Sequence, residues 1–244
     1  MKGNDCMEQN IEKRQSQFPR FYELYQLSEQ SHPDNFFTNA FQRQFAYEPQ
    51  LAEMIYGPLE KALERLDKAA WLQLVAKALP WINQKHLARQ WSQLFNHLFE
   101  AFGYEWLSKN GYTNIKFVEC SDKRAQRTPE LIGKSETSTA ILEVKTINRS
   151  DDEIRRLGVF PAPVFNLGQS SLSEGFKNKF LEDIRNAKAQ LEKFDEPNDK
   201  KIVLIVIRPD CEFWLRSEIY GEIEKLAAAQ QTSDFEVVLY HLVR

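Results

Sequence analysis

Two acidic residues and a lysine stand at the ends of neighbouring apolar segments of the chain. Glu130 follows a proline, and Glu143 and Lys145 close the apolar run that begins at Ala140. Two carboxylates can hold a divalent cation, and an amine beside them can orient or deprotonate a water. Residues of these types indicate metal-assisted hydrolysis of a phosphodiester bond.

The acid-x-lysine triplet is common by itself, so the sequence around it is more informative than the triplet. A second triplet begins at Asp199, but it follows a polar turn around Pro197, whereas Glu143 ends an apolar run. Residues two apart on a strand point to the same face, so a plain ion pair between Glu143 and Lys145 is the structural alternative to catalysis. For Glu130 and Glu143, the alternative is a pair of solvated charges at strand ends.

Composition places the chain among ordinary globular proteins. It has 244 residues, 42% of them hydrophobic and 27% charged, which suffices for one substantial domain or a core domain with a helical extension. No apolar run approaches the ~20 residues of a membrane span, and the polar start contains no apolar signal core. We therefore expect a cytoplasmic protein without a membrane partner.

Cysteine spacing and net charge narrow the function little. Cys6, Cys120 and Cys211 lie far apart without metal-ligand spacing, which indicates unpaired thiols in a reducing compartment. A net charge of −3 neither predicts nor excludes nucleic-acid binding, because a local basic face can be offset by acidic residues elsewhere.

Residues 1–82 are predicted to form an all-helical N-terminal extension. Apolar residues recur at three- and four-residue spacing over 18–28, 36–45, 49–65 and 68–79. Asp67 is expected to cap the last of these helices and Pro80 to end it. The aromatic side chains of this region are expected in a core rather than on a base-stacking surface; they are Phe21, Tyr22, Tyr25, Phe36, Phe37, Phe41, Phe45 and Tyr47.

Residues 83–244 change to an alternating α/β pattern. The pattern predicts a long helix from Asn83 to about Asn110, which Gly111 ends in a left-handed conformation. Then follow strands over 115–120, 129–132 and 139–147, a helix over 174–194, a strand over 201–207 buried on both faces, a helix over 216–230 and a strand over 235–242. The long irregular segment 151–173 is expected to border the functional site.

This order and several short motifs resemble the PD-(D/E)XK nuclease superfamily, over roughly residues 84–208. The matching pieces are Phe99-Glu100-Ala101, Gly111-Tyr112, Pro129-Glu130, Glu143-Val144-Lys145-Thr146 and Lys188-Ala189-Gln190-Leu191. The resemblance implies a restriction-endonuclease-like α/β core with a central mixed β-sheet flanked by helices. Its residues would be 83–244, preceded by the helical extension.

The resemblance also implies roles for the acids and the lysine. Glu130 and Glu143 become ligands of Mg²⁺, with Mn²⁺ as a substitute; the carbonyl of Val144 becomes a third ligand, and Lys145 acts on the attacking water. The family usually has aspartate where this chain has Glu130. The extra methylene lets that carboxylate reach farther and holds it less rigidly.

Two helical residues complete the site that the resemblance implies. Glu100 matches a glutamate on the first helix, with Gly103 allowing a neighbouring backbone to approach. The alternatives for that position are a solvent-facing acid, or Glu105, which lies in an apolar stripe where an acid is costly unless it is paired or metal-bound. Gln190 matches a glutamine of RecB-type nucleases, although Phe194 stands where that group commonly has tyrosine.

The expected function is that of a Mg²⁺-dependent endonuclease acting on DNA. Basic residues expected to bind the nucleic acid are Arg127, Arg149, Arg155, Arg156 and Lys188. A homodimer or a larger nucleoprotein complex is left open. Two alternatives also stay open: a catalytically inactive nuclease-fold subunit with a structural or interaction role, and an RNA-processing nuclease.

Overall fold

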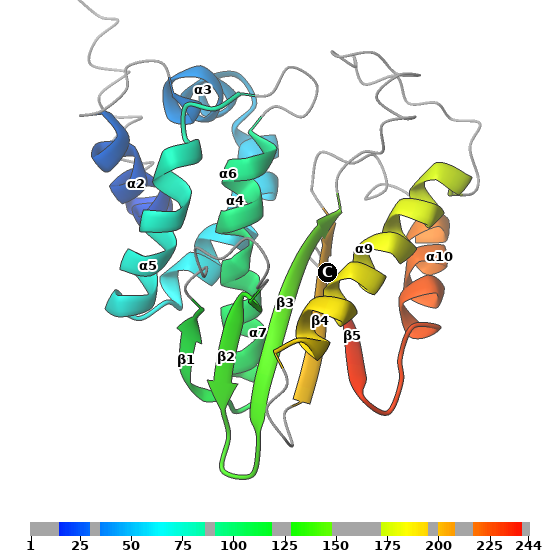
Figure 1. Ribbon diagram of the computed structural model, residues 1–244. Coiled ribbons are helices and arrows are strands. Elements are labelled where there is room, and N and C mark those ends of the chain that lie inside the picture. Colours follow the sequence, from blue (N-terminus) through cyan, green and yellow to red (C-terminus); the bar gives the residue numbers. More distant parts are fainter. Residues whose placement is uncertain are drawn as a thin grey trace, which may run out of the picture.

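A five-stranded mixed β-sheet lies between two layers of helices (Figure 1). The computed structural model describes residues 15–29, 35–85, 91–118, 128–147, 172–194, 200–207 and 217–240. The strands follow each other across the sheet in sequence order; they are β1 (Thr113–Phe117), β2 (Leu131–Lys134), β3 (Thr139–Ile147), β4 (Lys200–Ile207) and β5 (Phe235–Tyr240). The α/β class with a mixed sheet flanked by helices is therefore confirmed.

The sheet changes from antiparallel to parallel pairing at β3. β1, β2 and β3 are joined as an antiparallel meander, while β3, β4 and β5 run parallel. Parallel neighbours need a crossover connection. Helix α9 (Glu174–Glu192) lies between β3 and β4 in the chain, and α10 (Ser217–Ala228) lies between β4 and β5.

Side chains of β3 alternate between two separate cores. Ala140, Leu142 and Val144 belong to one core, whereas Ile141 and Ile147 belong to the other. Strand β4 is buried on both faces from its third residue onwards, as its continuous aliphatic run predicts.

The first core joins all the helices before β1 to one face of the sheet. These helices are α2 (Pro19–Glu29), the π-helix η1 (Phe37–Phe41), α3 (Gln42–Tyr47), α4 (Pro49–Glu64), α5 (Lys68–Ala78), the 3₁₀ turn η2 (Leu79–Trp81), α6 (Ser92–Leu98) and α7 (Glu100–Lys109). Helices on both sides of residue 83 thus share this core, and the domain boundary drawn there stays a prediction.

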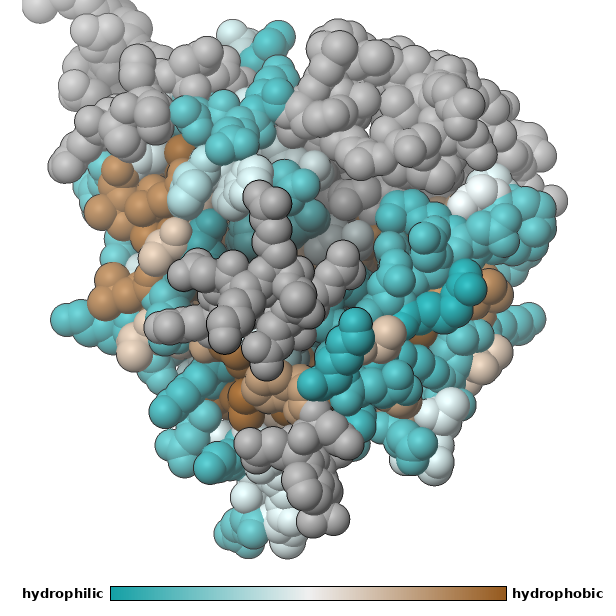
Figure 2. All heavy atoms as spheres, in the orientation of Figure 1, coloured by the Kyte–Doolittle hydropathy of each residue, from teal (hydrophilic) through white to brown (hydrophobic). Residues whose placement is uncertain are grey.

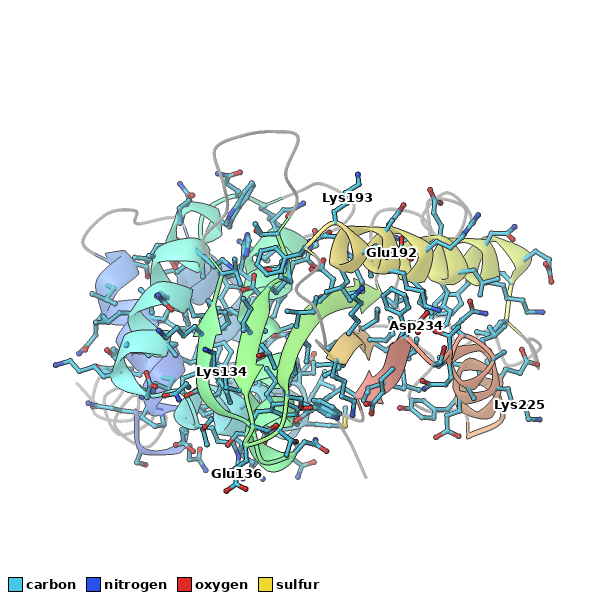
Figure 3. All side chains as sticks on the ribbon, turned by 60° about the horizontal axis from the view of Figure 1, so that its bottom comes forward. Lys134, Glu136, Glu192, Lys193, Lys225 and Asp234 are labelled. Carbon is cyan, nitrogen blue, oxygen red and sulfur yellow. The ribbon has the colours of Figure 1, made fainter. Side chains whose placement is uncertain are left out.

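The second core lies under α9 and α10 on the opposite face. Phe176, Phe180 and Ile184 of α9 pack there with Ile219 and Ile223 of α10. Seen from below, the two helical layers flank the sheet, with Lys134 and Glu136 at the β2–β3 hairpin (Figure 3). Hydrophilic side chains cover most of the surface over α9 and α10 (Figure 2), because the apolar stripe of each helix faces the sheet.

Most of the predicted elements are present, and the differences have local causes. The long helix expected from Asn83 to Asn110 is wrong: residues 82–83 form a turn, and α6 and α7 are separated at Phe99. There the helix tightens, since Phe102 donates to the Phe99 carbonyl three residues back, at 3.0 Å. The expected core position is wrong for one aromatic residue, Tyr47, because it is 79% exposed.

Both predicted helix caps are confirmed. Asp67 accepts a hydrogen bond from the Ala70 amide at 2.8 Å. Gly111 donates to the Ser108 carbonyl at 3.2 Å, and its φ of 81° turns the chain so that the Tyr112 amide reaches the carbonyl of residue 107 at 3.0 Å.

In the part of the chain that is described, no helix is long and apolar enough to cross a bilayer.

A buried carboxylate from α4 caps the start of α2. The residue before α2 is Phe18, whose side chain cannot accept a hydrogen bond, so the first amides of the helix need another acceptor. Glu60 supplies it, accepting from Arg20 N at 2.7 Å and Phe21 N at 3.0 Å. Burial raises the pKa of Glu60 to about 7, against the lowering effect of those two amides.

Glu60 should make the protein less stable as pH rises. The folded protein holds this proton up to about pH 7, whereas the group in the unfolded chain loses it near pH 4.5. Stability should therefore fall between these two values, by up to about 1.4 kcal/mol per pH unit from this one group. In Glu60→Gln that part of the slope should vanish, as measured by urea unfolding at pH 5, 6, 7 and 8.

The control is Glu53→Gln, because Glu53 lies on the same helix, is exposed and is not among the groups that shift the pKa of Glu60. Equal slopes in both variants and the unmodified protein would contradict the assignment to Glu60.

Candidate active site

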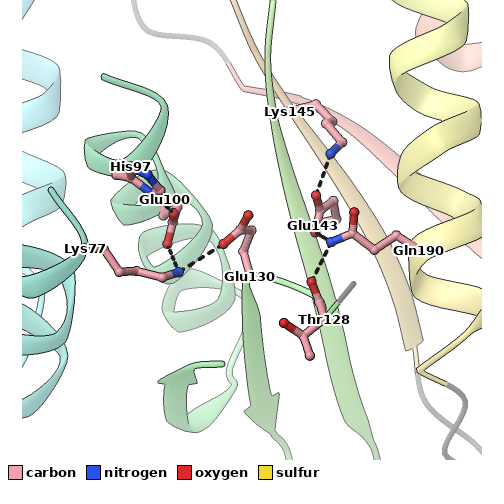
Figure 4. Close-up of polar contacts among 8 residues, drawn as sticks. All are labelled: Lys77, His97, Glu100, Thr128, Glu130, Glu143, Lys145 and Gln190. Carbon is pink, nitrogen blue, oxygen red and sulfur yellow. Dashed lines mark hydrogen bonds and ion pairs between the residues drawn. The ribbon is translucent and has the colours of Figure 1, made fainter. Parts of the chain in front are cut away.

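Glu143 lies at the centre of a polar cluster built on β3 (Figure 4). Its side chain is 1% exposed, and Lys145 donates to its Oε1 at 2.6 Å. Gln190 of α9 donates to its Oε2 at 2.8 Å and also to the carbonyl of Thr128. The Glu143 carboxylate and the Gln190 amide therefore join β3 to α9 and to the segment that enters β2.

Glu130 stands directly before β2, and its side chain meets α5, where Lys77 donates to its Oε2 at 3.0 Å. Leu131 pairs with Leu142, and the Glu130 amide also donates to the Leu142 carbonyl at 3.1 Å, so residues 130 and 131 both stand against Leu142, as in a β-bulge. Glu130 acts on Glu143 electrostatically, because its charge raises the pKa of that buried carboxyl.

Glu100 joins this row from the other helical layer. It is 2% exposed, contacts His97 Nδ1 at 2.9 Å and accepts from Lys77 Nζ at 2.6 Å. The same amine donates to Glu130 Oε2 at 3.0 Å. The alternative of a solvent-facing acid at Glu100 is therefore wrong.

Lys77 was not identified from the sequence. It belongs to α5 and is separated from Glu100 by 23 residues and from Glu130 by 53. One feature could have indicated that Lys77 is paired: it lies beside Leu74 and Ala78, which are buried residues of the same helix, and a lysine in such a place needs a partner. No motif names that partner, because the partner comes from tertiary packing.

The charge of Glu130 raises the proton affinity of the two buried carboxylates, Glu100 and Glu143. Burial, and then repulsion from Glu130, raise the pKa of Glu143 to about 8 although Lys145 opposes the shift. Burial and Glu130 likewise raise the pKa of Glu100 against His97 and Lys77. The pKa of Lys77 is itself raised, because Glu100 and Glu130 outweigh the effect of its burial. Positive charge is what this site favours.

Glu105, the rival of Glu100, has a different role. It is 4% exposed and pairs with Arg65 and Lys109, each at 2.8 Å, and with the hydroxyl of Tyr240. Burial alone would raise its pKa, but Lys109 and Tyr240 lower it below the usual value. Its partners come from α4, α7 and β5, so Glu105 joins elements of the fold rather than meeting Glu130.

The donor set suits a divalent cation, although no such site is assembled. Among the described residues, no group of three or more acidic, histidine or cysteine side chains is arranged to hold a metal. Lys77, Lys145 and Gln190 occupy the carboxylates instead. A carboxylate has about four acceptor sites, however, so hydrogen bonds from these residues leave room for a cation.

The backbone of β3 supplies the third expected ligand on the appropriate edge. Carbonyls two residues apart on a strand face the same edge. Since the Leu142 carbonyl accepts from Glu130, the carbonyl of Val144 faces that edge one step further along β3. The two carboxylates and this carbonyl form the hard-oxygen set that Mg²⁺ prefers.

The basic residues expected at nucleic acid are mostly outside the described residues. Arg127, Arg149, Arg155 and Arg156 lie there, as do residues 151–171 of the segment expected to border the site. Lys188 is not brought to the carboxylates: its amine donates to the Gln230 carbonyl at 2.6 Å and lies over the ring of Phe235.

Comparison of the sequence with models of known protein families and with curated proteins finds no match.

Gly103 sets the distance between α7 and strands β2 and β3. A Cβ there would lie 2.8 Å from Leu131 Cδ1 and 2.9 Å from both Leu142 Cδ2 and Val144 Cγ2. The close approach expected at this glycine is real, but side chains make it rather than a neighbouring backbone. Glu100 lies one turn earlier on α7, so this contact also positions Glu100 against the sheet.

Gly103→Ala should lower the free energy of unfolding by about 1–3 kcal/mol, because a methyl group enters a filled core. Gly57→Ala is the control: it is also helical, its nearest neighbour would be 3.9 Å away, and alanine should stabilise that helix by up to about 1 kcal/mol. Urea unfolding of both variants measures the difference. A stabilised Gly103→Ala protein would contradict the close packing.

Proposed function

We propose that this chain is a metal-dependent endonuclease with a restriction-endonuclease-like fold. The observation that supports it most is the row of Glu100, Glu130 and Glu143, in which Lys77 bridges the first two acids while Lys145 and Gln190 hold the third. A structural ion pair needs one acid and one base, whereas this row concentrates acids whose repulsion a cation would relieve.

The strand arrangement supports the same proposal. The triplet lies on the third strand of an antiparallel meander, the next strand is parallel to it, and α9 connects the two. This is the order that the resemblance implies, with the acid after Pro129 on the neighbouring strand. β5 and α10 extend the sheet beyond that core.

The roles of the residues follow from their positions. A divalent cation held by Glu130, Glu143 and the Val144 carbonyl would polarise the scissile phosphate and acidify a water. Lys145, fixed by Glu143 Oε1, directs its amine at the charge that develops on the attacking oxygen and the phosphate. Gln190 fixes the other oxygen of Glu143, so the carboxylate cannot turn away.

Glu100 and His97 act behind these residues. His97 and Lys77 hold both oxygens of Glu100, and Lys77 passes that restraint on to Glu130. Because Glu130 has the longer arm of glutamate, an external restraint of this kind compensates for the flexibility that the extra methylene adds. DNA is the proposed substrate class, on the resemblance alone.

A catalytically inactive nuclease-fold subunit is the second candidate. It is favoured by the engagement of Glu130 and Glu143 with lysine and glutamine side chains, and by the absence of an assembled metal group among the described residues. Incubation with plasmid, single-stranded and branched DNA and with RNA, with and without Mg²⁺ or Mn²⁺, distinguishes the two. Metal-dependent cleavage of DNA supports the proposal, cleavage of RNA alone redirects it to RNA processing, and no cleavage of any substrate favours the inactive subunit.

Lys145→Ala should reduce metal-dependent cleavage by about 10²–10⁴-fold while leaving nucleic-acid affinity largely intact. An amine directed at the transition state contributes to rate more than to ground-state binding. Single-turnover cleavage and binding to labelled DNA in Ca²⁺ measure the two effects separately.

Lys134→Ala is the matched control, since Lys134 is an exposed strand lysine at the β2–β3 hairpin. Circular dichroism melting verifies that both variants are folded. An unchanged cleavage rate in folded Lys145→Ala protein would remove the lysine from the chemistry.

A further inference from the structure

Lys77 is a charged group of the site that neither the triplet nor the acid after Pro129 accounts for. Its amine lies 2.6 Å from Glu100 Oε2 and 3.0 Å from Glu130 Oε2, so it bridges a carboxylate of α7 and the carboxylate directly before β2. Its side chain is 17% exposed and lies over the Phe117 ring, with the amine 5.5 Å from the centroid. Helix α5 therefore fixes a positive charge between two acids.

A bridging cation between two carboxylates is the position that a second metal ion would take. Two-metal sites hold their ions roughly 3.5–4 Å apart on shared carboxylates. Here Glu130 would be the shared acid: it contacts Lys77, and it lies between Glu100 and Glu143 in Figure 4. The ammonium thus occupies the Glu100 side of Glu130, and the Glu143 side is left for a divalent cation.

The charges support a single divalent ion. Glu100, Glu130 and Glu143 together with one phosphodiester bring four negative charges, and Lys77, Lys145 and one divalent cation bring four positive charges. A second divalent cation added to both lysines would leave two positive charges in excess in a buried site, where uncompensated charge is costly.

We infer that the ammonium of Lys77 replaces a second metal ion, so that the site binds one divalent cation and takes its other positive charge from α5. This rests on the proposed function, because it assumes that Glu130 and Glu143 bind a metal. It also gives the N-terminal helices a role in the site itself, since α5 is part of them.

Removing the charge should open the second position. Lys77→Met keeps the length of the side chain without its charge, and Lys77→Gln keeps donors for Glu100 and Glu130 without the charge. Lys68→Met is the control, because Lys68 is exposed at the start of the same helix. Calorimetric titration with Ca²⁺ of the full-length proteins, after a circular dichroism melt of each, gives the number of ions bound.

The expected result is one Ca²⁺ per chain for the unmodified protein and Lys68→Met, and two for whichever neutral Lys77 variant folds. One Ca²⁺ in all proteins, or two in the unmodified protein, would overturn the inference and leave the proposed function intact. If the unmodified protein binds none and a neutral variant binds one, Lys77 does hold a cation position, but the proposed metal dependence fails.

No Ca²⁺ bound by any of the proteins overturns both. If neither neutral variant folds, the same melts repeated in Ca²⁺ decide: recovery of a folded transition supports a cation in place of the ammonium, and no recovery overturns it.

Discussion

Carboxylates that are buried away from water need cations or hydrogen-bond donors, and the middle of this molecule holds a row of them. Glu100 and Glu143 are nearly inaccessible to solvent, and Glu130 lies between them in Figure 4. Breaking a buried ion pair by removing one partner costs about 3–5 kcal/mol, because the other charge stays buried. Each element that enters the site must therefore bring a donor or a positive charge.

This requirement explains why the site is built from so many separate elements. Strand β3 brings Lys145. The two helical layers, on opposite faces of the sheet, bring Lys77 and Gln190. The same layers bury the two cores, so the packing of the helices on the sheet also determines which charges of the site are paired. A shift of α5 or α9 would weaken a core and leave an acid without its partner.

Gly103 and Glu60 also link the packing of the helices to the support of the carboxylate site. Gly103 lets α7, which carries Glu100, pack closely on β2 and β3. Glu60 anchors α2 on α4, which packs in the same core as α5 and α7. The N-terminal helices are therefore part of the support of the site, whatever else they bind.

Local patterns in the sequence were sufficient for the elements, and tertiary packing was needed for the partners. Strand 139–147, the doubly buried strand β4 and the caps at Asp67 and Gly111 were predictable, because periodicity and capping depend on neighbouring residues. That Glu130 and Glu143 share one cation stays a prediction from their places on consecutive strands. The contacts of Lys77 and Lys188 could not be predicted, since a charged side chain on an amphipathic helix has the same sequence pattern whether it meets water, a carbonyl or a carboxylate.

The sequence by itself determined which residues could do chemistry. Only the packing of α5, α7 and α9 on the sheet decided which of those residues meet, because burial and electrostatic pairing depend on contacts between residues far apart in the chain.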